Sequence, residues 1–557
     1  MILLFILLPR NGHGCTNFLV SRGATVDGST MITYAADSHV LYGELYYFPA
    51  ADYPAGAMLD VYEWDSGRFL GRIKQVRHTF SVIGNMNEYQ VAIGETTYGG
   101  RYELVDTTGI IDYGSLMYIT LQRARSAREA IKIMSELVTE YGYCSSGESF
   151  SISDPGEVWI MELIGKGPGN KGAVWVARRV PDGYVSGHAN HPRITTFPLE
   201  DGKISISTRS LDKIFDPGVE NVYDKDVFEV ARKFGWFSGE DKDFSFSDTY
   251  APIDFSGARA CEARVYSGFN KVTSGMEKYL DYAMGYNLTN RMPLWVKVDK
   301  KLTVRDVMGM MRDYFQNTPM DMTQDIGAGP YRCIVRWRPM SWKVDGQQYI
   351  NERAISTQQT GFSFVAQSRN WLPNPVGGIL WFGVDDTYTT VYTPMYCGMT
   401  TVPECFAVGN GSMMEFSENA GFWVFNQVSN FAYTRYSDMI SDIQPVQDKL
   451  ELGYIEKIKE VDHTAEVLFK KSPKKARKYL TAFSVNAGNQ TVAEWKKLYT
   501  FLFTKYMDGN IKADRPVPQG YKYYTPTVRQ PGYDEQWYRM VVEDAGEKLK
   551  VPEGGGH

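Results

Sequence analysis

The sequence predicts a mixed α+β fold in which helices cover sheets. Short strand patterns come first along the chain, two helical patterns follow, and strand patterns then return. The 557 residues include 43% hydrophobic and 22% charged residues, as in folded globular proteins. The aromatic share of 14%, with 37 Tyr, indicates half-buried sheets or clefts lined by apolar side chains. A layered arrangement follows, because each element must bury one apolar face against another.

The strands are predicted from apolar runs that are bounded by turn residues. Asp27-Gly28 is a turn signal between the first two runs. The Gly-rich segment 165–172 lacks the Gly-Lys-Ser/Thr ending of a phosphate loop, so we interpret it as a hairpin loop. The predicted strands span residues 16–21, 30–35, 90–96, 158–164 and 173–179.

The helices are predicted from apolar residues at helical spacing. The clearest begins after Ser126, which forms a capping-box pattern with Glu129, and ends at Gly142. Its apolar stripe is interpreted as core. After about residue 300 the composition changes, and residues 316–430 are rich in Trp, Tyr, Pro and Gly. Further helices are predicted at residues 113–124, 303–315, 439–471 and 492–506.

An apolar N-terminal segment precedes Cys15. Residues 3–8 resemble the apolar part of a signal peptide, and Gly12 and Gly14 stand at positions −3 and −1 before Cys15. No Lys or Arg precedes the apolar run, so a propeptide is the alternative. A signal peptide predicts a secreted or periplasmic bacterial protein, whereas a propeptide predicts a cytoplasmic one. A lipoprotein signal, which would leave Cys15 lipidated, is a third interpretation, and Gly12 fits its motif poorly.

Removal of residues 1–14 would give Cys15 both a thiol and a free α-amine. The thiol is a nucleophile, and the amine can accept its proton. An α-amine has a pKa of roughly 7.7–8.0, which suits a general base at neutral pH. Because the nitrogen of a peptide bond is not basic, cleavage before Cys15 would be the activating step.

Several classes of partner and cofactor are disfavoured by the composition. The net charge of −6 and the lack of a basic block disfavour nucleic acid. No apolar run after Leu8 is long enough to span a membrane. The six Cys have no CxxC spacing, and the seven His include no HExxH motif, so neither a metal site nor an organic cofactor is expected.

Several blocks together resemble the cysteine-type dipeptidase family of N-terminal-nucleophile hydrolases. These enzymes are related to the secernins and, more distantly, to penicillin V acylase and bile salt hydrolase. The resemblance covers roughly residues 15–430 and is specific only in combination. The blocks are Cys15-Thr16-Asn17, Asp27-Gly28-Ser29, residues 35–39, residues 87–97, residues 126–130, residues 153–159, residues 179–184 and Ala189-Asn190.

The resemblance implies a four-layer αββα sandwich with a mixed and helical C-terminal extension. It implies three parts: a signal peptide or propeptide in residues 1–14, a catalytic core in residues 15–300, and a region 301–557 packed on that core. It also implies hydrolysis of small peptides, typically dipeptides, without a cofactor, and it allows a homo-oligomer. Cys15 would be freed by a signal peptidase or by autoprocessing, and its attack would form a thioester.

The site residues are also implied by the resemblance. Cys15 matches the nucleophile, and Asp37 matches an Asp that orients the α-amine. The acylase relatives have an Arg three residues before that Asp, where this chain has Tyr34. Each expected residue has a structural alternative: Asp37 as a turn cap, Asn190 as a loop residue, Arg264 as a surface strand residue. The expected catalytic residues are Cys15, Asp37, Thr97, Asn190 (or, by register, His191) and Arg264, and the expected substrate-binding residues are Glu95, Thr96 and His191.

Two other functions stay open from the sequence. The first is an amidase or acylase of the same fold that acts on non-peptide amides. The second is a secreted lipoprotein that serves as a binding module anchored through Cys15.

Overall fold

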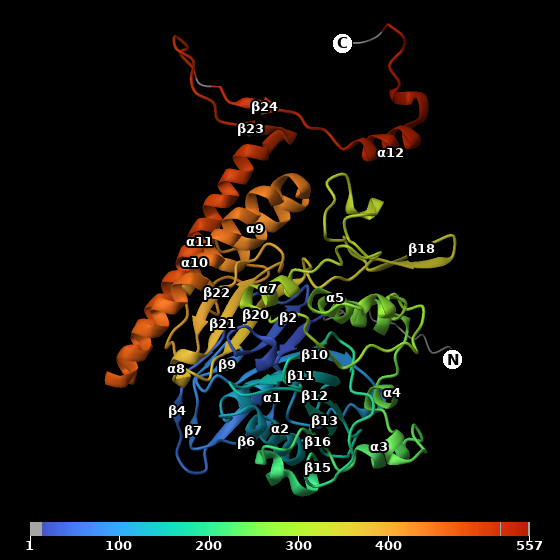
Figure 1. Ribbon diagram of the computed structural model, residues 1–557, viewed down its shortest axis with the longest axis vertical. Coiled ribbons are helices and arrows are strands. Elements are labelled where there is room, and N and C mark those ends of the chain that lie inside the picture. Colours follow the sequence, from blue (N-terminus) through green and yellow to red (C-terminus); the bar gives the residue numbers. More distant parts are fainter. Residues whose placement is uncertain (1–13, 524, 555–557) are drawn as a thin grey trace.

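The computed structural model describes residues 14–523 and 525–554, so the segment expected to be removed lies outside the described residues except for Gly14. Within this part of the chain the fold is mixed α+β, as expected, and two large sheets form its centre (Figure 1). The first sheet has seven strands among the described residues. In spatial order they are β17 (Trp295–Lys297), β14 (Tyr184–His188), β1 (Asn17–Val20), β2 (Thr30–Asp37), β20 (Thr360–Ser368), β21 (Ile379–Val384) and β22 (Thr393–Tyr396).

The second sheet has nine strands within the same described ranges. In spatial order they are β15 (Ser205–Ser207), β16 (Asn221–Tyr223), β13 (Ala173–Arg179), β12 (Val158–Gly165), β11 (Gly147–Ser153), β10 (Ala92–Gly99), β9 (Met86–Asn87), β8 (Val82–Ile83) and β3 (Tyr47–Phe48). Shorter hairpins and pairs surround the two sheets. They are β4 (Ala51–Asp52) with β7 (His78–Thr79), β5 (Met58–Tyr62) with β6 (Phe69–Lys74), β18 (Ser341–Val344) with β19 (Gln347–Ile350), and β23 (Ile511–Ala513) with β24 (Thr527–Arg529).

The five strands predicted from the sequence are confirmed as β1, β2, β10, β12 and β13, and residues 165–172 connect β12 to β13 as a hairpin loop. The first sheet also takes strands from the aromatic-rich region. β20 pairs antiparallel with β2, so residues from both sides of the expected division at residue 300 share one sheet. The division itself stays a prediction.

The two faces of the second sheet bury two different cores. On β12, Ile160 and Ile164 pack into the core between the sheets, whereas Trp159 and Met161 pack into the core beneath the helices α1 (Tyr113–Leu121) and α2 (Ala127–Tyr141). Side chains alternate in direction along a strand, so a continuous apolar run serves both cores. This explains why β12 reads as unbroken Val-Trp-Ile-Met rather than as an alternating pattern.

Helices lie on the outer faces of both sheets (Figure 1). Helices α1 and α2 contact β10 to β13, and the helices near the other sheet contact β2, β14 and β20 to β22. The remaining helices are α3 (Val227–Lys233), α4 (Phe246–Tyr250), α5 (Ala263–Val272), α6 (Leu280–Ala283), α7 (Val304–Met311), α8 (Asn374–Gly377), α9 (Gly421–Tyr433), α10 (Tyr436–Lys471), α11 (Pro473–Tyr506) and α12 (Glu535–Ala545).

Helix α2 begins where the capping signal predicts, but only half of the box forms. The Ser126 side chain accepts a hydrogen bond from Glu129 N. The Glu129 carboxylate instead accepts from Arg125 N, at 2.7 Å. Gly142 ends the helix in a left-handed conformation (φ 78°), as the glycine predicts.

Helix α11 is longer than the sequence predicts, because it begins at Pro473 rather than near residue 492. Its first half is poor in strong apolar signals. Gly488 lets the helix lie against Pro403, since a Cβ there would come within 2.6 Å of the Pro403 ring. Ser484 accepts a hydrogen bond from Tyr396 N of β22. Packing against β22 therefore sets the length of this helix, not intrinsic propensity.

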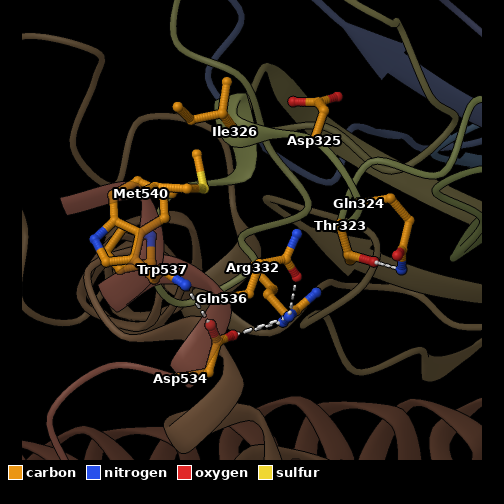
Figure 2. Close-up of a pocket in the computed structure, with 11 residues that line it drawn as sticks. Thr323, Gln324, Asp325, Ile326, Arg332, Asp534, Gln536, Trp537 and Met540 are labelled. Carbon is orange, nitrogen blue, oxygen red and sulfur yellow. Dashed lines mark hydrogen bonds and ion pairs between the residues drawn. The ribbon is translucent and has the colours of Figure 1, made fainter. Parts of the chain in front are cut away.

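A C-terminal arm, residues 511–554, follows α11 and carries α12 (Figure 1). Figure 2 shows where the arm meets the core: Arg332 contacts Asp534 through Nε and Nη2, at 3.1 and 2.9 Å. Asp534 also caps α12 by accepting from Trp537 N. The small cavity at this contact is about 100 Å³.

No helix in the described ranges is both long enough and apolar enough to cross a bilayer.

His188 joins the two sheets. It lies on β14 of the first sheet, and its ring contacts the Thr96 hydroxyl of β10 (2.7 Å) and the Ser151 hydroxyl of β11 (2.8 Å). Burial, with Arg193 nearby, lowers the pKa of His188 to about 3. The ring is therefore neutral at pH 7. We interpret His188 as a structural residue rather than a base.

His188 should make stability depend on pH. Its pKa is about 3 in the folded chain and about 6.5 in the unfolded chain, so the unfolded chain binds the proton first. Stability from this group is present above pH 6.5 and is lost as the pH falls toward 3. Between pH 6.5 and 4.5 the free energy of unfolding should therefore fall less steeply in His188→Gln than in wild type. The difference in slope should be about 1 kcal/mol per pH unit.

Urea unfolding at pH 6.5, 5.5 and 4.5 measures this difference. His463→Gln, at an exposed position of α10, is the control and should keep the wild-type slope. Equal slopes for His188→Gln and wild type would contradict the prediction.

Candidate active site around Cys15

Cys15 lies at the start of a central strand. Thr16 forms a β-bridge with Ala35, and β1 then runs between β14 and β2. The Cys15 side chain is 5% exposed, and it lines a cavity of about 540 Å³. The apolar strand sequence Phe18-Leu19-Val20 fixes this position, because all three side chains are fully buried.

The cavity wall is acidic and aromatic. Its carboxyl groups come from five segments of the chain, and its aromatic rings come from the first sheet, from α1 and from the connecting segments. The acidic side chains are Asp37, Glu44, Glu63, Asp65, Glu95 and Glu148, and the aromatic ones are Tyr34, Tyr42, Tyr46, Trp64, Tyr113, Tyr118 and Phe362. A cavity of this size, with polar groups set among aromatic rings, suits a small ligand.

Arg264 holds the backbone around Cys15. Its Nη1 donates to Cys15 O at 2.6 Å and to the Thr16 hydroxyl at 2.8 Å, and it also reaches Gly14 O at 3.3 Å. Its Nη2 donates to Asn190 Oδ1 at 2.8 Å. Burial, with Arg353 nearby, lowers the pKa of Arg264 to about 10, so the group stays charged at neutral pH.

The alternative that Arg264 is a surface strand residue is wrong. Arg264 is 1% exposed and lies on α5. This helix continues directly from a π-helical turn, Gly257–Glu262. Such turns change the register of a helix and recur at functional sites.

Asp37 ends strand β2 and is not a turn cap. A bulge between Ala36 and Asp37 redirects the end of the strand. One carboxylate oxygen accepts from Arg353 Nη2 and the other from the Thr360 hydroxyl, both at 2.6 Å. Burial raises the pKa of Asp37, and Arg353 opposes that rise. The backbone oxygen of Asp37 accepts from Gly14 N at 2.9 Å.

Arg353 is a site residue that the sequence did not reveal. Its Nη2 contacts both Asp37 and the carbonyl oxygen of Gly14. Two guanidinium groups therefore meet the Gly14 carbonyl, one from α5 and one from the segment before β20. Arg353 is separated from Asp37 by more than half of the chain and belongs to no motif, so no local pattern marks it.

Asn190 and Thr97 lie beside this cluster. The Asn190 side chain accepts from Arg264 and donates from Nδ2 to Thr97 O at 2.7 Å. Asn190 itself has a left-handed backbone (φ 59°), which Asn tolerates better than most residues. Both groups of its amide are engaged, so its contacts are those of a residue that positions Arg264.

Thr96 and His191 are placed away from the cavity. The Thr96 hydroxyl contacts His188 between the sheets. His191 is buried beside Gly257, and its Nε2 has no hydrogen-bond partner among the described residues. Neither residue lines the cavity among the described side chains, and their expected binding roles stay predictions.

Glu95 and Tyr34 stand next to the thiol. Cys15 Sγ is 3.8 Å from Glu95 Oε1 and 3.9 Å from the Tyr34 hydroxyl. The Tyr34 hydroxyl donates to Glu95 at 2.5 Å. Tyr34 thus stands three residues before Asp37 on β2, and its hydroxyl binds a carboxylate. Burial, then Glu95 and Asp37, raise the pKa of the Cys15 thiol, so the resting thiol is neutral.

The geometry defines a candidate site for a cysteine nucleophile: a buried thiol at a strand end, beside carboxyl groups, on the wall of a cavity. Within the described residues, no group of three or more His, Cys, Asp or Glu side chains is arranged to hold a metal ion.

Comparison with known proteins agrees with this class. Residues 40–449 match the model of Peptidase family C69. The matched region begins after Cys15 and includes Glu95, Asn190, Arg264 and Arg353. Because it covers most of the chain, the chain belongs to Peptidase family C69 and is a peptidase of the cysteine type.

Individual relatives have low sequence identity to this chain, but the similarity extends over most of its length. "Probable dipeptidase" of Latilactobacillus sakei is 22% identical over 413 residues, covering 70% of this chain and 76% of the relative. "Dipeptidase A" of Lactobacillus helveticus is 22% identical over 444 residues, covering 76% and 82%. "Probable dipeptidase B" of Streptococcus pyogenes serotype M1 is 20% identical over 522 residues, covering 89% and 94%.

The ion pair of Arg353 with Asp37 should be essential for stability. Both side chains are buried, at 7% and 0% exposure. Arg353→Met leaves the Asp37 carboxyl without its counter-ion and should lower the free energy of unfolding by about 3–5 kcal/mol. Adding Asp37→Asn removes the uncompensated charge and should recover part of the loss.

Urea unfolding of both single variants and the double variant measures the coupling, which should be about 0.5–3 kcal/mol. Strictly additive effects would show that the pair does not act as a unit.

Proposed function

We propose that this chain is a dipeptidase whose nucleophile is the thiol of Cys15, freed as the N-terminal residue by removal of residues 1–14. The observation that carries the proposal is the position of Cys15: at the start of a buried central strand, on the wall of a cavity, with the preceding carbonyl held by two guanidinium groups. The names of the relatives support small peptides as substrates.

The arrangement of layers supports an N-terminal-nucleophile hydrolase. In that fold, two sheets pack face to face between helical layers, and the nucleophile starts a strand of the inner pair. Here β1 and β2 contact β10 to β12, while α1 and α2 cover one outer face and α9 to α11 the other (Figure 1). We assign the chain to the four-layer αββα class on this basis.

The surroundings of the Gly14–Cys15 peptide bond favour autocatalytic removal of residues 1–14. Hydrogen bonds from Arg264 and Arg353 polarise the Gly14 carbonyl. Attack of Cys15 Sγ on that carbonyl carbon forms a thioester to Gly14 as the C–N bond breaks, and the amine takes up the proton. Water then hydrolyses the thioester and releases residues 1–14. The buried junction disfavours access by a signal peptidase, although export of the chain stays a separate proposal.

Substrate hydrolysis repeats this chemistry on a peptide. The α-amine of Cys15 takes the thiol proton while Sγ attacks the carbonyl carbon of the first substrate residue. The leaving amine of the second residue receives that proton as the peptide C–N bond breaks. Water resolves the thioester and releases the first residue. Arg264 holds the Cys15 carbonyl, Asn190 positions Arg264, and Asp37 orients the freed α-amine.

Burial of Cys15 argues against the lipid-anchor alternative. A diacylglyceryl group on Sγ would have to fill an acidic cavity rather than reach a bilayer. Apolar chains gain nothing by leaving a membrane for such a site.

Cys15→Ala should abolish dipeptide hydrolysis, because the substitution removes the nucleophile, and Cys15→Ser should retain at most a trace. The assay is turnover of a dipeptide panel by the purified chain. Cys405→Ala, a buried thiol outside the cavity, is the matched control and should keep wild-type turnover.

Unchanged turnover in folded Cys15→Ala would overturn the mechanism. Hydrolysis of N-acylated amines without hydrolysis of any dipeptide would instead assign the chain as an amidase.

A further inference from the structure

Two carboxyl groups in the cavity have a hydrogen-bond partner on only one of their two oxygens. Glu95 is 2% exposed and Glu148 is fully buried. Tyr34 donates to one oxygen of Glu95, and Thr97 donates to one oxygen of Glu148, at 2.8 Å. The other oxygen of each, Oε2, has no hydrogen-bond partner among the described residues. Burial raises the pKa of both groups, and they interact with one another, so the pair can share a proton. Because a buried polar atom without a partner is costly, the two free oxygens point to a ligand that donates hydrogen bonds, and an ammonium group is such a donor.

The protein itself supplies no such partner. None of the described residues that line the cavity is Lys, Arg or His. Other carboxylates of the wall already have partners: Asp37 pairs with Arg353, and Glu44 accepts from Gly409 N at 2.8 Å. Among the described side chains of the wall, the buried carboxyl oxygens that lack a hydrogen-bond partner are therefore those of Glu95 and Glu148.

The distance from the nucleophile selects the kind of cation. Glu95 Oε1 lies 3.8 Å from Cys15 Sγ. A carbonyl carbon that is about to be attacked lies roughly 3–3.5 Å from the nucleophile. The α-nitrogen of the same residue is only two covalent bonds from that carbon, so it falls beside Glu95. The ammonium of a Lys side chain sits at the end of a four-carbon stem and would lie well beyond this point.

We propose that Glu95, supported by Glu148, binds the α-ammonium group of an unblocked peptide and so restricts hydrolysis to the first peptide bond. This inference rests on the proposed function: a dipeptide carries a free amino terminus, and the inference names the carboxyl groups that recognise it. Tyr34 and Thr97 act as positioning residues, since each fixes one carboxylate oxygen and leaves the other for the ligand.

Binding of the cation also acts on the thiol. Burial and then Glu95 raise the pKa of the Cys15 thiol, and burial and then Glu95 raise the pKa of Glu148. A positive charge placed beside these carboxyl groups offsets their field and lowers the thiol pKa. A blocked peptide brings no such charge. The free amino terminus is therefore both an anchor and an activator.

The test compares one dipeptide with its N-acetyl derivative. Wild type should prefer the free dipeptide in kcat/KM by about 100-fold or more, as expected when a buried charge loses its partner. Glu95→Gln should lower kcat/KM for the free dipeptide by a similar factor and change that for the acetylated one less than about threefold. The preference should therefore collapse. Glu44→Gln, which removes a carboxylate of the same cavity, should keep the preference within about twofold.

Binding without turnover separates recognition from catalysis. Calorimetric titration of the dipeptide into a Cys15→Ala chain that is produced without residues 1–14 should give measurable affinity, and adding Glu95→Gln should weaken it at least tenfold. A melting curve for each variant shows whether it is folded. If Glu95→Gln misfolds, Glu148→Gln serves in the same two assays, with the same direction of change expected.

Two results would overturn the inference. One is an equal loss of kcat/KM on both substrates in Glu95→Gln, which would assign Glu95 to the nucleophile alone. The other is a wild-type enzyme that does not discriminate between them. Neither result touches the proposed function, which fails separately if hydrolysis of dipeptides does not depend on Cys15.

Discussion

The site depends on one constraint: two guanidinium groups are held inside the protein against the carbonyl groups of residues 14 and 15. Arg264 reaches both carbonyls from a helix on the outside of the first sheet, and Arg353 reaches the Gly14 carbonyl from the segment that leads into β20. Each cation is expensive to bury, so each needs anionic or carbonyl partners. Asp37 supplies the charge for Arg353, while Arg264 is surrounded by carbonyl oxygens and by Asn190. The position of the thiol is thereby determined by groups from four distant segments.

Groups of opposite charge lie on the two sides of the Cys15 thiol. The backbone side of Cys15 is cationic, and the cavity side is anionic, with Glu95 at 3.8 Å from Sγ. In the proposed processing step, the cationic side would stabilise the negative charge that develops on the Gly14 carbonyl. The anionic side keeps the resting thiol neutral and attracts a substrate that carries a positive end. One residue can in this way serve two successive reactions, since each reaction uses a different side of it.

Local signals predicted much of this structure. Turn residues and apolar runs gave β1, β2, β12 and β13, and apolar spacing gave α2 and α10, because these elements are stabilised by their own sequence pattern. The resemblance brought together Cys15, Asp37, Arg264 and Asn190, which the structure places in one cluster. Arg353 and Glu148 were missed because their roles arise from strand pairing between segments far apart in sequence. The first half of α11 was missed because packing against β22, and not propensity, forms it.

The central claim is that Cys15 acts as a free N-terminal residue, and the mature N-terminus of the active chain tests it most directly. Chains with Gly14 still attached and chains that begin at Cys15 should be separated, identified by intact-mass spectrometry and assayed on the same dipeptide. The account predicts that all turnover resides in chains that begin at Cys15, and that a thiol alkylator which inactivates them modifies that residue. Equal turnover by chains that retain Gly14 would contradict the account, because the nitrogen of a peptide bond cannot serve as the base.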